Sequence, residues 1–309
     1  MKTLEYDEDE SKMPPHVLAA HKKHQQKCSD GTAHESTLAL PESGATKVLL
    51  HSCCAPCSGA MVLEMQQLGF DVTVFFYNPN IHPRREYDIR KEENKRFAAK
   101  LGIPFVDMDY DSEAWFARAV GMEGDPERGR RCTMCFDMRM ERTALYASEN
   151  GFPVIATTNA TSRWKDAEQV DSSGVRAAAR YGGAVEYWKA DWQTDAMTLR
   201  KYQVAASERF YKQEYCGCSY SLRDSNEWRR ANGIPKIRIG GETAGLGDRY
   251  FTDPETDAAE ESQEVVDEFF RSANEAVATT QEERREKWNL YAERKKTACA
   301  GEAGDLNNW

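Results

Sequence analysis

The stretch Leu49-Leu50-His51-Ser52-Cys53-Cys54-Ala55-Pro56-Cys57-Ser58 decides the fold, because a short apolar run leads here into a turn that carries three thiols. Val48 to Leu50 have the pattern of the end of a buried strand, and an apolar-periodic helix is predicted over 60–68. Open α/β sheets bind their ligands at the carboxyl ends of strands. Because the turn directs neighbouring thiols toward a common point, the stretch predicts a metal or cluster site.

Strand and helix patterns alternate on the C-terminal side of this stretch. Such alternation requires right-handed crossovers and produces a parallel sheet with helices on both faces. We therefore expect one Rossmann-like α/β domain over 46–230. The predicted strands are 48–52, 71–77, 104–108, 153–156 and 185–188, and the predicted helices after the first are 84–101, 115–120, 133–148, 164–181 and 193–211.

The two flanks differ in composition from this core. Residues 1–45 are polar and lack sustained periodicity, so we expect a mostly disordered leader whose histidines belong to a solvated tail rather than a metal site. Residues 231–309 begin with a glycine-rich linker and continue as a highly charged stretch with sparse apolar positions. That pattern predicts a helical accessory tail.

Composition limits the partners and the compartment. The chain has no run of 18 apolar residues, and its N-terminus lacks the apolar segment of a signal peptide, so we expect a soluble cytoplasmic protein with no membrane partner. The formal net charge of -10 argues against generic binding of polyanions. A local basic face, built from runs such as 84–85, 90–91 and 128–131, is still compatible with that charge.

Cysteines form the most informative pattern. A reducing compartment favours metal, cluster or redox chemistry over a structural disulfide framework. Arg131 precedes a CxxC that opens a predicted helix, and both a helix N-terminus and a guanidinium stabilise thiolates. Thiols from two such turns fit either a zinc site or a 4Fe-4S cluster. Of the nine cysteines, seven fall into three tight groups: Cys53, Cys54 and Cys57; Cys132 and Cys135; Cys216 and Cys218.

The Cys216-Gly217-Cys218 segment has a different spacing. A ring closed across one glycine is strained, and strain favours a reversible dithiol/disulfide couple. Two further metal ligands are the alternative interpretation.

Two polar loops follow predicted strands. Residues 77–83 carry Asn78, Asn80 and His82, and we expect this loop to line a pocket, with His82 either touching a ligand or serving a structural role. Residues 157–162 are rich in hydroxyls and suit a phosphate or ribose. Ser162 is also a candidate N-cap of the next helix.

Five ordered motifs together resemble the QueH-type epoxyqueuosine reductases over about 47–225. They are HSCCAPC at 51–57, YNPNIHP at 77–83, RCTMC at 131–135, TTNATS at 157–162 and YKQEYCGCSYS at 211–221. That family reduces the epoxide of epoxyqueuosine at the wobble position of tRNA, which yields queuosine. The resemblance implies an adenine-nucleotide α-hydrolase-like fold, a 4Fe-4S cluster, an unidentified electron donor and tRNA substrates with Asp, Asn, His and Tyr acceptors.

The resemblance also implies roles for individual residues. Cys216 and Cys218 would be the redox-active pair, which cycles through a disulfide bond, while His82 or Tyr77 would protonate the leaving oxygen. Some members have aspartate at the position of Cys57, which we expect to hold an additional mononuclear iron. Cys53, Cys54, Cys132 and Cys135 would be the cluster ligands, and Asn78, Asn80, Thr158 and Ser162 would contact the substrate.

Two other functions remain as alternatives. A zinc-binding scaffold or regulatory protein without catalysis would use the same thiols. A tRNA-thiolation enzyme with the same fold would need a Ser-Gly-Gly-x-Asp-Ser phosphate loop after the first strand, where this chain has cysteines instead.

Overall fold

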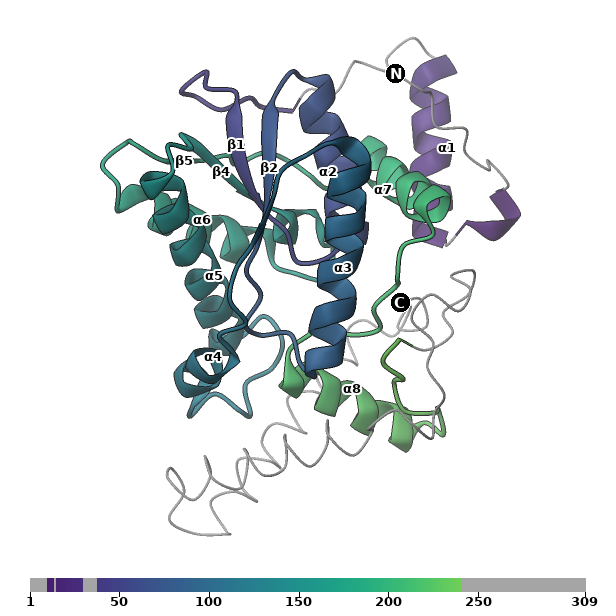
Figure 1. Cartoon of the computed structure of the whole chain (residues 1–309). Helices are drawn as coiled ribbons and strands as arrows, with labels where there is room; N and C mark the ends of the chain where they lie inside the picture. The colour runs from purple at the N-terminus through teal and green to yellow at the C-terminus, as the bar shows by residue number, and fades with distance from the viewer. Residues whose placement is uncertain (1–9, 14, 30–37, 241–309) are drawn as a thin grey trace. The chain divides into compact units, whose positions relative to one another are not determined.

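The computed structural model describes residues 10–13, 15–29 and 38–240. It contains a parallel sheet with the strand order β3-β2-β1-β4-β5, of which β1, β2, β4 and β5 are labelled in Figure 1. All four strand pairs are parallel, and Val48 of the central strand lies opposite Val72 on one side and Val154 on the other. The predicted parallel α/β sheet is therefore confirmed. The strands are β1 Lys47–His51, β2 Asp71–Phe76, β3 Phe105–Asp107, β4 Val154–Thr157 and β5 Glu186–Tyr187.

Helices connect the strands and flank the sheet. No helix of the described residues is both long enough and apolar enough to cross a membrane. The α-helices are α1 Pro15–Ser29, α2 Ala55–Gln67, α3 Arg84–Leu101, α4 Ser112–Ala119, α5 Arg130–Glu149, α6 Ala167–Ala179, α7 Asp195–Glu208 and α8 Ser219–Ala231, with short 3-10 helices η1 Glu10–Lys12 and η2 Thr158–Thr161.

The described residues form two compact units. The first contains the sheet and comprises the described residues up to Tyr77 together with Arg90–Asp109 and Phe136–Tyr211. The second comprises Asn78–Ile89, Tyr110–Cys135 and the described residues from Lys212 onward. The single domain over 46–230 stays a prediction.

The core of the first unit explains the apolar run of β1. Val48, Leu49 and Leu50 are fully buried, as expected for a parallel strand covered on both faces. Helix α2 packs closely on α7 because Gly59 has no side chain: a Cβ there would lie 2.8 Å from Val204. The packing of α2 fixes the turn that carries the cysteines.

Several predicted helix boundaries are wrong, including the starts of α4, α5 and α7, and those of α2 and α6 bear on the motifs. Helix α2 begins at Ala55 rather than at residue 60, because Pro56 occupies the first turn, where its missing N–H costs nothing. Helix α6 begins at Ala167, and its N-cap is Asp166, which accepts a hydrogen bond from the backbone N–H of Gln169 (3.0 Å). Ser162 is therefore not the N-cap of this helix.

The leader also differs from the prediction. Helix α1 packs on α7, and Met13, Val17 and Leu199 form a buried apolar cluster. His21 is buried there and contacts Gln25, with 2.7 Å between Nε2 of each side chain. A sparse apolar stripe is enough for burial because α7 supplies the partner surface. The predicted tail helix lies outside the described residues.

Candidate metal and redox sites

The first unit holds a topological switch point. Strand β1 pairs with β2 on one side and β4 on the other, so the chain order reverses between β1 and β4. The carboxyl ends of these strands are joined through His51, whose Nδ1 lies 2.8 Å from Thr157 Oγ1. Its Nε2–H donates to the carbonyl of Tyr77 (3.1 Å). Cys53 and Thr158 follow β1 and β4, so they lie where open α/β sheets bind ligands.

Cys53, Cys54 and Cys57 come together at the N-terminus of α2. Their three Sγ atoms lie within 4.8 Å of one another, and those of Cys53 and Cys54 are 3.7 Å apart. Cys54 is the N-cap, and the backbone N–H of Cys57 donates to its carbonyl (3.2 Å). Three clustered sulfurs suit a soft metal such as zinc or cluster iron.

These three thiols differ in acidity. Hydrogen bonds from the thiols of Cys54 and Cys57 hold the pKa of Cys53 well below its usual range, and the charge of Lys165 and the hydroxyl of Thr158 lower it further. The pKa values of Cys54 and Cys57 are raised, chiefly by their hydrogen bonds to Cys53. The cluster therefore favours the thiolate at Cys53 and the thiol at Cys54 and Cys57, and a metal that bound Cys54 or Cys57 would displace a proton from it.

Buried polar side chains support this cluster. Thr158 Oγ1 accepts the backbone N–H of Cys53 (3.1 Å) and donates to its Sγ (3.4 Å). Asn94 Oδ1 accepts the hydroxyls of Ser52 (2.6 Å) and Ser58 (3.1 Å). The sequence pattern predicts Thr158 as a substrate contact rather than as a partner of Cys53. It does not predict Asn94, because one asparagine on the charged helix α3 has no distinguishing pattern. Its role depends on which helix face packs on the turn.

The second unit holds the Cys216-Gly217-Cys218 turn in its reduced form. Both cysteines are free thiols. Gly217 has a φ of 113°, a backbone conformation that favours glycine. Ser221 contacts both cysteines: its N–H donates to Cys218 Sγ (3.4 Å), and its hydroxyl accepts the N–H of Cys216 (3.3 Å) and donates to Glu127 (2.7 Å).

His82 lies beside this turn. Its backbone N–H donates to the carbonyl of Gly217 (2.8 Å), and its own carbonyl accepts the hydroxyl of Tyr215 (2.5 Å). The ring packs edge-on against Phe116, and its Nδ1 lies 3.3 Å from the hydroxyl of Tyr110. Burial lowers the pKa of His82 to about 4, so the ring is neutral at pH 7.

The CxxC lies near the N-terminus of α5, which begins at Arg130 rather than at the predicted residue 133. Burial raises the pKa of Cys132 far above its usual range, and the charges of Cys216, Cys218 and Cys135 raise it further. Burial also raises the pKa of Cys218 to about 12, an effect that Arg131 opposes. The four cysteines of this unit therefore interact electrostatically and favour the protonated form at Cys132 and Cys218.

Arg131 is the cation of this unit's thiol group. Its side chain is 1% exposed, donates to the carbonyl of Met122 (2.8 Å) and lies 4.7 Å from the ring centre of Tyr220. Its Nε and Nη2 have no hydrogen-bond partner among the described residues. Arg131 thus opposes the effect of burial by lowering the pKa of Cys132 and Cys218, as expected for an arginine beside a CxxC.

The remaining candidates are distributed over both units. Asn78 and Asn80 are buried in the second unit, and Asn80 Oδ1 has no hydrogen-bond partner among the described residues. Tyr77 and Ser162 are buried in the first unit, where Ser162 ends η2. The backbone carbonyl of Tyr77 is the group that His51 contacts at the end of β1.

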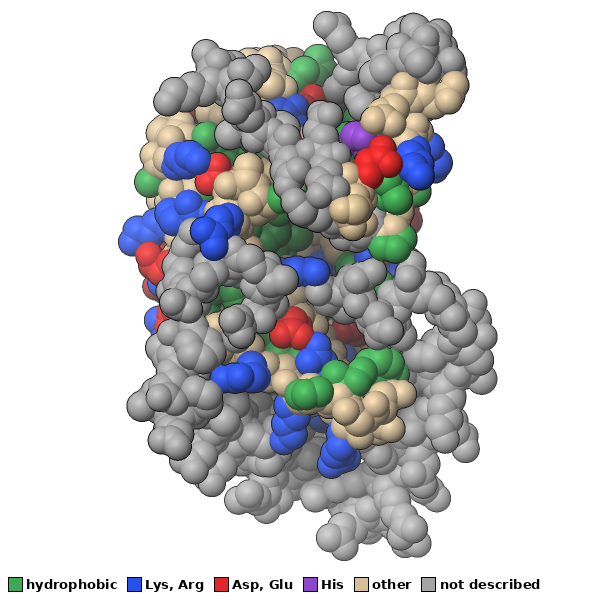
Figure 2. Space-filling model, turned by 90° about the vertical axis from the view of Figure 1, so that its right-hand side faces the viewer, with side chains coloured by type: hydrophobic (Ala, Val, Ile, Leu, Met, Phe, Trp, Pro, Cys, Tyr) green, Lys and Arg blue, Asp and Glu red, His purple; other side chains and the backbone are tan. Residues whose placement is uncertain are grey.

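The basic runs 84–85, 90–91 and 128–131, which could have formed a basic face, are mostly paired with acidic side chains or buried. Arg84 pairs with Asp88 (3.0 Å), Lys91 with Asp107 (3.4 Å) and Arg130 with Asp125 (3.1 Å), whereas Arg90 and Arg131 are buried. On the face drawn in Figure 2, Lys and Arg side chains are interleaved with acidic, polar and apolar ones among the described residues.

Comparison with known proteins identifies the family. The family model described as "Epoxyqueuosine reductase QueH" matches residues 48–224. Proteins of that name from Histophilus somni, Acinetobacter baylyi and Haemophilus influenzae are 54%, 55% and 56% identical to this chain. The matches cover 75%, 66% and 66% of this chain and 94%, 92% and 82% of those proteins. This chain belongs to the QueH family of epoxyqueuosine reductases.

Proposed function

We propose that this protein reduces the epoxide of epoxyqueuosine in tRNA to the alkene of queuosine; its relatives are named epoxyqueuosine reductases. The observation that carries the proposal is the reduced Cys216/Cys218 dithiol, which lies within the span that the family model matches. We place the reaction in the cytoplasm, where thiols stay reduced. The proposed substrates are the tRNAs with Asp, Asn, His and Tyr acceptors.

We assign Cys53, Cys54, Cys132 and Cys135 as ligands of a 4Fe-4S cluster. Two observations support the assignment: Cys53 is already biased toward the thiolate, and its sulfur neighbours suit soft metals. Cys57 would hold an additional iron. When bound, these iron centres supply one-electron transfer and a Lewis acid for oxygen.

The dithiol can supply the electrons and protons that the reduction consumes. Conversion of the epoxide to an alkene breaks both C–O bonds and requires two electrons and two protons, with oxygen leaving as water. Oxidation of Cys216 and Cys218 to a disulfide releases two electrons and two protons. The pKa of about 12 keeps Cys218 protonated at pH 7, so the thiol retains its proton until it is oxidised. An external donor would then reduce the disulfide.

His82 is proposed to accept a hydrogen bond and so to orient the substrate, rather than to protonate the leaving oxygen. Because the hydroxyl of Tyr110 donates to the carbonyl of Ile81 (2.6 Å), it accepts from Nδ1–H of His82. This contact leaves Nε2 as an acceptor on a neutral ring. Tyr77 remains the alternative acid. The proposed substrate contacts are Asn78, Asn80, Thr158 and Ser162. The role of the 77–83 loop is supported by Asn80 Oδ1, which is buried and has no hydrogen-bond partner among the described residues.

An anaerobic assay tests the function. The reconstituted protein, given a chemical reductant and tRNA that carries epoxyqueuosine, should convert the nucleoside to queuosine, as measured by mass spectrometry of the digested tRNA. Unchanged epoxyqueuosine with a fully loaded protein would refute the activity.

The zinc-scaffold alternative has one observation in its favour, because three sulfurs within 4.8 Å also suit zinc. Colour separates the two cofactors. Protein purified without oxygen should be brown with broad visible absorption if it holds a cluster, and colourless with stoichiometric zinc if it is a scaffold.

A further inference from the structure

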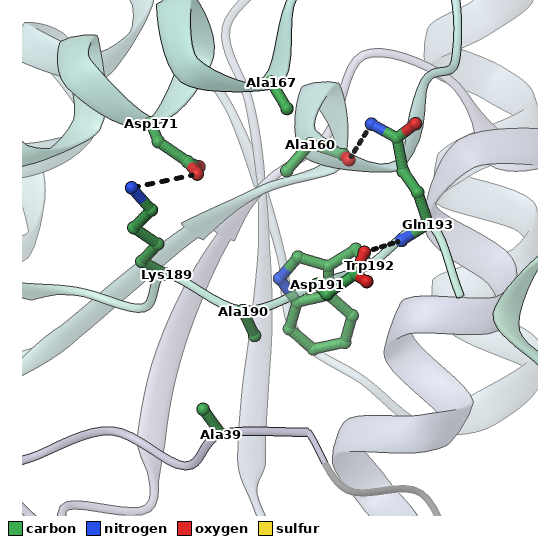
Figure 3. A pocket seen from close by; sticks show the side chains of 9 residues that line it. All are labelled: Ala39, Ala160, Ala167, Asp171, Lys189, Ala190, Asp191, Trp192 and Gln193. Carbon is green, nitrogen blue, oxygen red and sulfur yellow. Dashed lines mark hydrogen bonds and ion pairs between the residues drawn. The ribbon is translucent and has the colours of Figure 1, made fainter.

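A cavity of about 400 Å³ lies beside the carboxyl ends of β4 and β5 in the first unit, and the mechanism above does not use it. Figure 3 shows the methyl groups of four alanines around the hollow, with Asp171 and Lys189 on one side and Gln193 on the other. The cavity falls within the size range of small-molecule sites. Its lining comes from the 38–40 segment, η2, the start of α6 and the loop after β5.

The walls suit a flat aromatic ring. Ala39, Ala160, Ala167 and Ala190 contribute only methyl groups, so they leave room for a planar group between them. The ring of Trp192 is buried and packs edge-on against Trp188, with 5.1 Å between ring centres, which holds this wall rigid.

The polar groups of the cavity suit the edge of a nucleobase. Gln193 Nε2 donates to the carbonyl of Ala160 (3.0 Å), and the backbone N–H of Gln193 donates to Asp191 (2.9 Å). Lys189 lies 3.9 Å from Asp171, which also accepts the hydroxyl of Tyr187 (2.8 Å). Carboxylate and amide oxygens accept base N–H groups. Because the carboxylates of Asp171 and Asp191 outnumber the one cation among the described lining residues, Lys189, a base fits the inside better than a phosphate.

Cations lie on the loop that joins two of the lining elements. Arg163, Trp164 and Lys165 connect η2 to α6, and the guanidinium of Arg163 lies 4.5 Å from the ring centre of Trp164. Arg163 is exposed, and Lys165 is close enough to Cys53 to lower its pKa. An arginine, an aromatic ring and a lysine in sequence are typical of contacts to single-stranded RNA.

We propose that this cavity binds an unstacked nucleobase of the substrate RNA, next to the nucleotide that is reduced, while Arg163 and Lys165 contact the phosphates. The proposal rests on the proposed function. Bases of single-stranded RNA loops are commonly splayed out into protein pockets, where aromatic and polar groups read them. The cavity therefore holds the RNA in register with the thiol cluster at the adjacent strand end.

Filling the cavity tests the proposal. The cluster-loaded Ala190→Leu variant should raise KM for an anticodon stem-loop RNA with epoxyqueuosine by about tenfold and change kcat by less than about twofold. Ala167→Leu, at the exposed start of α6, provides a second variant with little risk to folding. Ala184→Leu, exposed and outside the cavity, is the matched control and should leave both constants unchanged.

Abasic RNA identifies the bound base. We expect wild-type protein to bind one of two stem-loops, lacking the base just before or just after the wobble nucleotide, about tenfold more weakly by fluorescence anisotropy. Ala190→Leu should not distinguish that RNA from the intact one. Equal binding of all RNAs by wild-type protein, or additive losses in the variant, would overturn the proposal. Anisotropy needs no turnover, so failure of the reductase assay alone would refute only the proposed function.

Discussion

The thiol cluster of the first unit and the thiol group of the second differ in protonation. Cys53 is biased toward the thiolate because two thiols, a hydroxyl and Lys165 surround it. The pKa of Cys218 is raised to about 12 because the effect of burial outweighs the effect of the nearby Arg131 charge. Metals bind thiolates, whereas a dithiol reductant must carry protons with its electrons. The same side chain is thus prepared for two kinds of chemistry by its surroundings.

The neighbours of the two thiol groups differ as well. The first cluster lies among hydroxyls and amides, with Thr158 donating directly to Cys53 Sγ. The second group lies beside aromatic rings, including Tyr220 under Arg131 and Phe116 against His82. Hydrogen-bond donors stabilise charge on sulfur, and apolar rings disfavour it. Four experiments test this comparison.

Removal of the thiolate should have the largest effect. Cys53→Ala is expected to lose cluster iron and to reduce activity to the background rate, because water replaces a thiolate ligand poorly. Iron analysis and visible absorption measure the loss. Cys28→Ala, which removes a thiol outside the three cysteine groups, should keep its iron. A Cys53 variant with full iron content would refute the assignment.

Removal of the redox thiol should separate iron content from turnover. Cys218→Ser is expected to retain iron and absorption but to lose most multiple-turnover activity, because serine cannot close the disulfide. Thiol titration adds a check, since wild-type protein oxidised by substrate should show two fewer thiols than reduced protein. Loss of iron in this variant would return Cys216 and Cys218 to metal binding.

Removal of the buried cation should weaken the second unit. Arg131→Met leaves the carbonyl of Met122 without its donor and should lower the unfolding free energy by about 2 kcal/mol in denaturant titrations. Arg130→Met is the matched control, since that side chain is 76% exposed and pairs with Asp125 at the surface. The control should change stability by less than about 0.5 kcal/mol. Equal effects would show that burial of Arg131 does not matter.

The smallest effect should come from His82 and depend on pH. Its pKa of about 4 lies below the unfolded value of 6.5, so its contribution to stability is present above pH 6.5 and is lost as pH falls toward 4. At pH 5.5 the loss is about 1 kcal/mol. Between pH 7.5 and 5.5, His82→Gln should therefore lose less stability than wild type in thermal unfolding. Identical pH dependence would contradict a neutral, buried ring.

Local signals determined much of the fold before any packing was known. Helix α3 was predicted with both ends correct because Pro83 precedes it and Gly102, at a φ of 69°, follows it. The apolar run before Cys53 predicted a buried central strand, and β1 is one. Alternation of strands and helices predicted the parallel sheet. These features depend on backbone preferences and short-range periodicity.

Helix boundaries and supporting residues depended on tertiary contacts instead. Helix α1 is stable because α7 buries Val17, and α8 was not predicted at all. Ser221 and Asn94 become important only when a helix brings them to a cysteine turn or to the hydroxyls beside it. No local pattern distinguishes such residues from ordinary polar ones.

The sequence by itself determined the family and the position of the cysteine groups and motif loops, since these are short-range patterns of reactive side chains. The tertiary structure decided which protonation state each thiol favours. Burial, Lys165 and the neighbouring thiols act through space, and they lower the pKa of Cys53 and raise that of Cys218. Acidity depends on solvation and on nearby charge, and neither can be derived from the order of residues along the chain.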